Sequence, residues 1–321
     1  MCIRIIASSF AVPPQVETSE EVALRLGRST DWVHERTGVH TRHVAGTLKD
    51  PAILAAAAAR PVVERHGEPD LLLYAGAIPR QMLPETSLFV HRELGLSGTP
   101  SFSVNSVCLS FLTALKTSEA LIGSGDFRRI LICCAELASR GRNFEEPESA
   151  ALLGDGAAAV MVEATDDRGA GFDAYRMQTW SEGVELTGVR GGGTWRPPDA
   201  PDVTPADHLF HMDGEALLRL TVPHLRRFLD DFLREAGIAA SDVDLVVPHQ
   251  PSGPGLRLLT RWGFPEDRVV NIIADYGNCV AASMPMALAV ADTEGRIKRG
   301  DRILFLGTAA GVSIGAGLFR W

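Results

Sequence analysis

The chain has 321 residues and a formal net charge of −9 at pH 7, with 45% hydrophobic and 22% charged residues. This length suggests about two domains, and the acidic charge argues against a nucleic-acid partner, since nucleic-acid surfaces are basic. No apolar run approaches the roughly 18 residues of a membrane span, and the start of the chain lacks the layout of a signal peptide, so we expect no membrane partner.

The cysteines fit neither a disulfide framework nor a zinc site. Their number is odd, their spacing is irregular and no C-x-x-C pair occurs. Such cysteines are typical of proteins in a reducing compartment, so we expect a cytoplasmic protein without a bound metal. The five are Cys2, Cys108, Cys133, Cys134 and Cys279.

The first half reads as alternating helices and strands. A helix capped by Thr18 or Ser19, with acidic residues in its first turn, runs to about Leu26. A long helical pattern rich in small residues covers about 108–123. Short apolar runs bounded by polar residues or glycine indicate buried strands at 70–76, 101–104 and 125–132.

The second half continues in the same way. Residues 176–206 are rich in glycine and proline and indicate a long loop, either a functional lid or a disordered surface insertion. A helix is expected from Asp213 to about Ala236, with an apolar stripe that includes Leu217, Leu218, Leu225, Phe228, Leu229 and Phe232. Strands are expected at 244–249 and 300–305, with a helical stretch at 279–297 between them.

The two halves repeat one another. Each has a strand that starts after an aspartate, Asp70 or Asp244, and a second strand that follows a Gly-Asp pair ending in Asp126 or Asp301. The separation of the two strands is almost the same in both halves, with a helix between them. We therefore expect a duplicated α/β fold whose halves are residues 1–165 and 166–321.

Cys108 is the first candidate for chemistry, because it falls near the start of a predicted helix, directly after a strand. The positive end of a helix dipole and the free N–H groups there lower the pKa of a thiol and stabilise a thiolate. The alternative is a small buried hydrophobic residue, which is what most free cysteines are.

His249 ends a predicted strand, where the carboxyl edge of an α/β sheet usually faces a ligand crevice. A histidine there can take or give a proton near neutral pH. The pair His208 and His211 has metal-like spacing but no evident third ligand, so no metal is expected.

Asn278 takes roughly the place in the second half that Cys108 takes in the first. Its amide could polarise a carbonyl oxygen, or it could only cap a helix. Cys279 is a rival nucleophile, which we expect to face the core. The glycine-rich stretch 307–317 is expected to form a tight turn that presents N–H groups to an oxyanion or simply packs the core.

These residues together resemble β-ketoacyl-ACP synthase III. The resemblance rests on a Cys-His-Asn signature, a Trp-x-x-x-Arg-Thr-Gly-Val element and a Gly-Asp-Gly-Ala stretch, in order along the chain. The matching residues are Cys108, 247–250, 277–285, 31–39 and 153–158. The resemblance implies a thiolase-like five-layered α-β-α-β-α fold, which agrees with the repeat, and a homodimer.

The resemblance also implies roles. Cys108 would carry an acyl group taken from an acyl-CoA or an acyl-carrier-protein (acyl-ACP) thioester. His249 and Asn278 would hold the oxygen of a malonyl-type thioester and favour its decarboxylation. The N–H groups of Cys108 and Ala310 would form the oxyanion hole. No cofactor would be bound permanently, since coenzyme A and carrier-protein thioesters are substrates.

Further positions follow from the same resemblance. Trp32 and Arg36 would contact the adenine end of coenzyme A, and Arg219 its phosphates. Leu83 stands where the family places an aromatic gate, contributed by the partner subunit, at the acyl pocket. The tail loop lacks the second catalytic cysteine of a thiolase, and Asn278 replaces one of the two histidines of elongating ketosynthases.

Some positions depart from the family pattern. Leu109 and Ser110 replace a small Ala-Gly pair, an Asn and an Arg are absent after His249, and Pro147 stands about where another coenzyme A-binding Arg is expected. We therefore expect weakened coenzyme A binding and a donor on an acyl carrier protein. Arg257 and Arg261 either meet such an acidic carrier or only form a solvated helix face.

The sequence thus predicts a decarboxylative Claisen condensation, in a specialised polyketide or fatty-acyl pathway. Two alternatives stay open. The acyl group on Cys108 could pass to a hydroxyl or amine with His249 as general base, or the chain could be a non-catalytic partner subunit. The complete set of Cys108, His249 and Asn278 argues against the latter.

Overall fold

The computed structural model describes residues 2–321 and contains two main sheets. The first sheet has the strand order β1-β7-β6-β4-β5. β4 pairs in parallel with β5 and β6, whereas β7 runs antiparallel to β6 and β1. Its strands are β1 (Cys2–Ala11), β4 (Leu71–Tyr74), β5 (Ser101–Ser103), β6 (Arg129–Leu137) and β7 (Asp155–Thr165).

The second sheet has the order β11-β12-β13-β8. β11 pairs in parallel with β12, and β13 runs antiparallel to β12 and β8. Its strands are β8 (Gly171–Thr179), β11 (Leu245–Pro248), β12 (Arg302–Ala309) and β13 (Ser313–Arg320). The predicted boundary at 165/166 lies between β7 and β8, the last strand of one sheet and the first of the other, and it stays a prediction.

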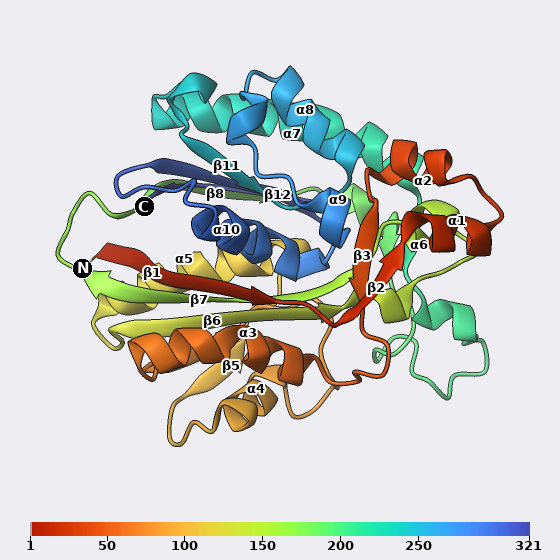
Figure 1. Cartoon of the computed structure of the whole chain (residues 1–321), viewed down its shortest axis with the longest axis horizontal. Helices are drawn as coiled ribbons and strands as arrows, with labels where there is room; N and C mark the ends of the chain where they lie inside the picture. Colours follow the sequence, from red (N-terminus) through yellow and green to blue (C-terminus); the bar gives the residue numbers. More distant parts are fainter. Residues whose placement is uncertain (1) are drawn as a thin grey trace.

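Figure 1 shows the predicted five layers, with helices outside and between the two sheets. α3 (Pro51–His66) and α4 (Thr86–Leu94) cover the outer face of the first sheet, and α7 (Gly214–Ala236) and α8 (Gly253–Arg261) cover that of the second. α5 (Ser110–Ser124) and α10 (Ser283–Thr293) fill the middle layer. The largest apolar core joins both sheets through these two helices, which are buried because sheets pack on them from both sides.

Small elements surround one end of the sheets. A two-stranded ribbon of β2 (Gln15–Thr18) and β3 (Thr41–Val44) carries α1 (Ser19–Leu26) and α2 (Thr30–Thr37). The remaining elements are η2 (Ala138–Gly141), α6 (Pro147–Ala150), η3 (Ser181–Gly183), β9 (Thr187–Gly188), η4 (Pro205–His208), β10 (His211–Met212), η5 (Ala240–Asp242), η6 (Glu266–Arg268) and α9 (Ile273–Tyr276).

The internal repeat extends to the turns before the middle helices, and it corrects the predicted pairing of Asn278 with Cys108. A 3-10 turn precedes each helix, η1 (Val107–Leu109) before α5 and η7 (Val280–Ala282) before α10. Each begins with a valine at positive φ, 54° in Val107 and 48° in Val280. This register makes Ala281 the counterpart of Cys108 and Asn105 the counterpart of Asn278.

Positive φ is strained for a β-branched residue and persists only where the surroundings enforce it. In both turns an asparagine side chain two residues earlier accepts the N–H of the valine. The distance is 2.9 Å from Val107 N to Asn105 Oδ1 and 2.8 Å from Val280 N to Asn278 Oδ1. The sequence offset was missed because propensities do not reveal this side chain-to-backbone contact.

Two other expectations need correction. The predicted loop 176–206 begins too early, since residues 176–179 belong to β8 and only the part after Thr179 is irregular apart from short elements. Leu218 is not on the buried stripe of α7, because it is 57% exposed. The predicted start of α7 is confirmed, with Asp213 Oδ1 accepting the N–H of Ala216 at 2.9 Å.

Candidate active site

Cys108 lies in η1 at the start of the middle-layer helix α5, as the sequence predicted. η1 packs against β12 of the second sheet and against η7. The N–H groups of Ala310, at the tip of the β12–β13 hairpin, and of Cys108 itself act on the thiol and lower its pKa. Two donors therefore surround the sulfur, one from each half of the chain.

The predicted net stabilisation of a Cys108 thiolate is wrong. Enclosure of the thiol raises its pKa to about 12, and the nearby Glu136 carboxyl adds to the rise. The two N–H groups oppose these effects but do not outweigh them. Desolvation dominates because a thiolate in an apolar enclosure loses its hydration. The resting sulfur is therefore a thiol.

His249 follows β11 and is almost completely buried, with 3% of its surface exposed. Burial lowers the pKa of its imidazole to about 4, so the ring is neutral at neutral pH. Its Nδ1 atom is buried without a hydrogen-bond partner. A Cβ placed on Gly307 would lie 2.9 Å from His249 Cβ and 3.0 Å from Leu109 Cδ2. Glycine at this position thus lets His249 approach the turn that carries Cys108.

The side-chain carboxamide of Asn278 is held so that its Nδ2 atom is left to donate a hydrogen bond. Its Oδ1 accepts from Val280 N at 2.8 Å and lies 3.4 Å from Ser283 Oγ. Its Nδ2 lies 3.4 Å from the carbonyl of Pro251, in the loop that follows His249. With the oxygen occupied, the second N–H of the carboxamide is free to donate. Cys279, the rival nucleophile, is fully buried as predicted.

Glu136 is a site residue that the sequence reasoning missed. It is fully buried in β6 and accepts from Ala77 N at 2.5 Å and Ile78 N at 3.2 Å. The N–H of Ala281 also stabilises its carboxylate, but burial dominates and raises its pKa to about 8. A lone carboxylate in an otherwise apolar strand was the available signal.

The predicted coenzyme A contacts lie on the helices α2 and α7. Trp32 is partly buried, and Arg36 contacts Glu148 at 3.4 Å. Arg219 contacts Glu215 at 3.6 Å. Both arginines are exposed on the surface, and each faces a carboxylate. The sequence reasoning noted Pro147 but not the neighbouring Glu148.

Leu83 is 85% exposed on the loop before α4 and is therefore not part of a pocket within one chain. His211 Nδ1 lies 2.7 Å from Glu146 Oε1, which gives this histidine a protein partner. Over residues 2–321, no group of three or more metal-ligating side chains occurs. None of the helices described is long and apolar enough to cross a membrane.

Comparison with known proteins matches two family profiles. 3-Oxoacyl-[acyl-carrier-protein] synthase III matches residues 102–181, and the C-terminal region of the same family matches residues 233–321. The beta-ketoacyl-[acyl-carrier-protein] synthase III of Erythrobacter litoralis is 36% identical, over 99% of this chain and 98% of that protein. The protein of the same name from Rhizorhabdus wittichii is 32% identical, with the same coverage.

Solved structures agree. The 3-oxoacyl-[acyl-carrier-protein] synthase III of Aquifex aeolicus has a TM-score of 0.88 at 28% identity, over 99% of this chain and 100% of that chain. The corresponding enzyme of Pseudomonas aeruginosa has a TM-score of 0.89 at 29% identity, over 100% of this chain and 98% of that chain.

Proposed function

The chain belongs to the 3-oxoacyl-[acyl-carrier-protein] synthase III family, and from that premise we propose that it condenses a Cys108-bound acyl group with a malonyl-type thioester. The family makes it a condensing enzyme of the acyltransferase class. The observation that supports the proposal is the packing of the segments that carry these residues. The turn of Cys108 packs against β12 and η7, Gly307 lies against both His249 and Leu109, and Asn278 contacts the loop that follows His249.

In the first step the sulfur of Cys108 attacks the carbonyl carbon of an acyl thioester. The new C–S bond forms as the old one breaks, and the departing thiol takes up the proton that Cys108 loses. The N–H groups of Cys108 and Ala310 would stabilise the transient oxyanion, because both lie beside the sulfur to which the attacked carbonyl carbon becomes bonded. The raised pKa of Cys108 implies that the thiol loses its proton during attack rather than before it, and that this proton passes to the departing sulfur.

In the second step the malonyl thioester binds with its carbonyl oxygen between His249 and the Nδ2 donor of Asn278. The bond to the carboxylate breaks, carbon dioxide leaves, and negative charge moves onto this oxygen. Two neutral donors in a dry site favour that charge without reorganising. The resulting carbanion attacks the acyl carbonyl, the C–S bond to Cys108 breaks, and a 3-oxoacyl thioester is released. The Cys108 thiolate then takes up a proton from water and returns to the resting thiol.

The test is to give the acylated enzyme a malonyl-carrier-protein and to measure carbon dioxide and the 3-oxoacyl product. We expect both in equal amounts, and loss of both in Asn278→Ala with Cys108 acylation retained. Acyl transfer to a hydroxyl or amine without carbon dioxide would contradict the proposal and favour the alternative acyltransferase. Absence of any acyl-enzyme would indicate the non-catalytic partner subunit instead.

For the donor, we propose an acyl carrier protein in preference to coenzyme A, in a specialised acyl or polyketide pathway. Arg36 and Arg219 each face a carboxylate, Glu148 and Glu215, which weakens their attraction for the phosphates of coenzyme A. Replacing Glu148 by glutamine should lower the KM for an acyl-CoA and leave that for an acyl-carrier-protein less changed. An equal effect on both donors would contradict this preference.

The docking surface for the carrier would include Arg257 and Arg261, which are exposed on α8. Their charge suits an acidic carrier. Reversing both to glutamate should raise the KM for the carrier-bound donor and leave that for acyl-CoA unchanged.

We also propose a homodimer joined along β5, with Leu83 reaching the acyl pocket of the partner. β5 is an edge strand with an open ladder. Large apolar side chains are exposed around it, namely Ile78, Met82, Leu83, Leu88 and Phe102. Sedimentation should report a dimer, and Leu83→Phe should shorten the accepted acyl chain.

The five free cysteines fit a cytoplasmic location, which we also propose.

A further inference from the structure

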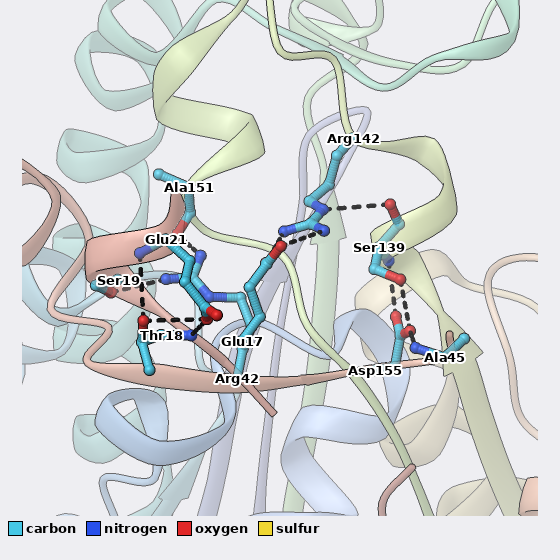
Figure 2. Close-up of polar contacts among 10 residues, drawn as sticks. All are labelled: Glu17, Thr18, Ser19, Glu21, Arg42, Ala45, Ser139, Arg142, Ala151 and Asp155. Carbon is cyan, nitrogen blue, oxygen red and sulfur yellow. Dashed lines mark hydrogen bonds and ion pairs between the residues drawn. The ribbon is translucent and has the colours of Figure 1, made fainter. Parts of the chain in front are cut away.

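Arg42 is a fully buried arginine that the proposed reaction does not use. It lies in β3 with 0% of its surface exposed. Its Nη1 donates to the carbonyl of Ala151, and its Nη2 donates to Ser19 Oγ at 2.8 Å (Figure 2). Burial lowers its pKa to about 10, so it still carries a positive charge at neutral pH.

Other charged groups continue in a row from this arginine (Figure 2). The Glu17 carboxylate attracts Arg42, whereas Arg142 repels it. Glu17 is also bound by Arg142, whose Nη2 lies 3.3 Å from Glu17 Oε1. Asp155 accepts from Ser139 and Ala45 at the far end of the row. Removing an arginine from water costs free energy, so a buried ion pair of this kind is weak evidence that Arg42 serves stability alone. The contacts of Arg42 indicate which segment it holds in place.

The carbonyl that Arg42 binds leads directly to Asn278. Ala151 precedes a short segment whose backbone pairs with that of Asn278. The carbonyl of Leu152 accepts Asn278 N at 2.9 Å, and Gly154 N donates to the Asn278 carbonyl at 3.1 Å. The main chain of Asn278 is therefore fixed by the segment that Arg42 holds.

The side chain of Arg42 also packs against this junction. A Cβ on Gly154 would lie 3.3 Å from Arg42 Cβ. A Cβ on Gly277 would lie 3.5 Å from Arg42 Cβ and 2.8 Å from the Leu152 carbonyl oxygen. Glycine at both positions lets the two segments and β3 approach one another. The Arg42 side chain thus lies close beside Gly277, the residue before Asn278, and close beside the segment that pairs with Asn278.

The turn of Cys108 has separate supports. Val107 N donates to Asn105 Oδ1, and Ser106 N donates to Ser110 Oγ at 3.0 Å. Neither contact involves β3 or residues 151–154. Replacing Arg42 therefore removes a support of the Asn278 main chain and leaves these hydrogen bonds of the Cys108 turn intact.

We propose that Arg42 is a positioning residue that holds the Asn278 carboxamide in place for the malonyl step and is not needed for acylation of Cys108. This inference rests on the proposed function, because only that function gives the two residues different steps. Misplacement of a donor by a fraction of an ångström is enough to slow a reaction that depends on it.

The experiment compares both steps in Arg42→Gln and Arg42→Lys. Transfer of an acyl group onto Cys108 is followed by mass spectrometry, and carbon dioxide release from a malonyl-carrier-protein is followed on the acylated enzyme. We expect carbon dioxide release to fall by about tenfold or more in Arg42→Gln and acylation to stay within about twofold. Arg42→Lys should recover part of the loss, since an ammonium can still donate to Ala151.

Arg129→Gln is the matched control, because Arg129 also donates to a main-chain carbonyl, that of His66 at 2.6 Å, and is partly buried. It should leave both steps unchanged. An equal fall in both steps at Arg42, or an unchanged malonyl step, would overturn the proposal. If Arg42→Gln does not fold, Arg42→Lys decides by the same comparison. A wild-type enzyme that acylates but releases no carbon dioxide refutes the proposed function itself, and this role with it.

Discussion

Replacing His249 by asparagine should remove a pH dependence of stability, because the imidazole is buried and neutral. Burial lowers its pKa from 6.5 to about 4. Between these values the unfolded chain binds a proton on the ring and the folded chain does not. The contribution of His249 to stability is therefore fully present above the unfolded pKa and is lost as the pH falls toward the folded pKa.

The size follows from the two pKa values. At 1.36 kcal/mol for each unit, the whole shift corresponds to about 3 kcal/mol of unfolding free energy. Acidification from about pH 7.5 to about pH 5 covers roughly 2 kcal/mol of it. Urea unfolding of both proteins at the two pH values measures this difference. The wild-type protein should lose about 2 kcal/mol more than His249→Asn.

The comparison of two proteins is necessary because other buried acids titrate nearby. Burial raises the pKa of Glu136 and of Asp155, which makes their own contribution run in the opposite direction with pH. These groups are present in both proteins and cancel in the difference. Equal pH dependence in both proteins would refute a buried, neutral His249, and with it the neutral donor proposed for the malonyl step.

Two further predictions concern the neighbours of the site. Gly307→Ala places a Cβ 2.9 Å from His249 Cβ, and should lower the unfolding free energy by about 1–3 kcal/mol and slow carbon dioxide release. Gly123→Ala is the control for thermal unfolding and turnover, because a Cβ there has no neighbour within 4 Å. Equal effects of the two substitutions would contradict the close packing of Gly307 against His249. Glu136→Gln removes a carboxyl that raises the pKa of Cys108, so alkylation by iodoacetamide should quicken most above about pH 8, where Glu136 ionises. An unchanged rate profile would show that this carboxyl does not influence the thiol.

The layered fold was predictable because its signals are local. Apolar runs bounded by glycine or aspartate marked β4, β6, β11 and β12, and their even spacing revealed the duplication. The cap of α1 is also encoded locally, since Thr18 and Glu21 form a capping box. These features depend on residues a few positions apart.

The parts that were missed depend on contacts between distant segments. The direction of the Cys108 pKa shift is set by enclosure and by Glu136 on another strand. The role of Arg42 depends on pairing between Gly154 and Asn278, which are far apart in the chain. The offset between Asn278 and Cys108 follows from the positive φ that Val107 and Val280 share, which is a property of the folded backbone.

The central claim is that Cys108 carries the acyl group. Intact-protein mass spectrometry after incubation with a series of acyl-carrier-protein and acyl-CoA donors tests it most directly, with peptide mapping of the adduct. We expect one acyl group per chain, on Cys108, that disappears in Cys108→Ala. An adduct that persists in Cys108→Ala or maps to Cys279, or no adduct with any donor, would contradict it.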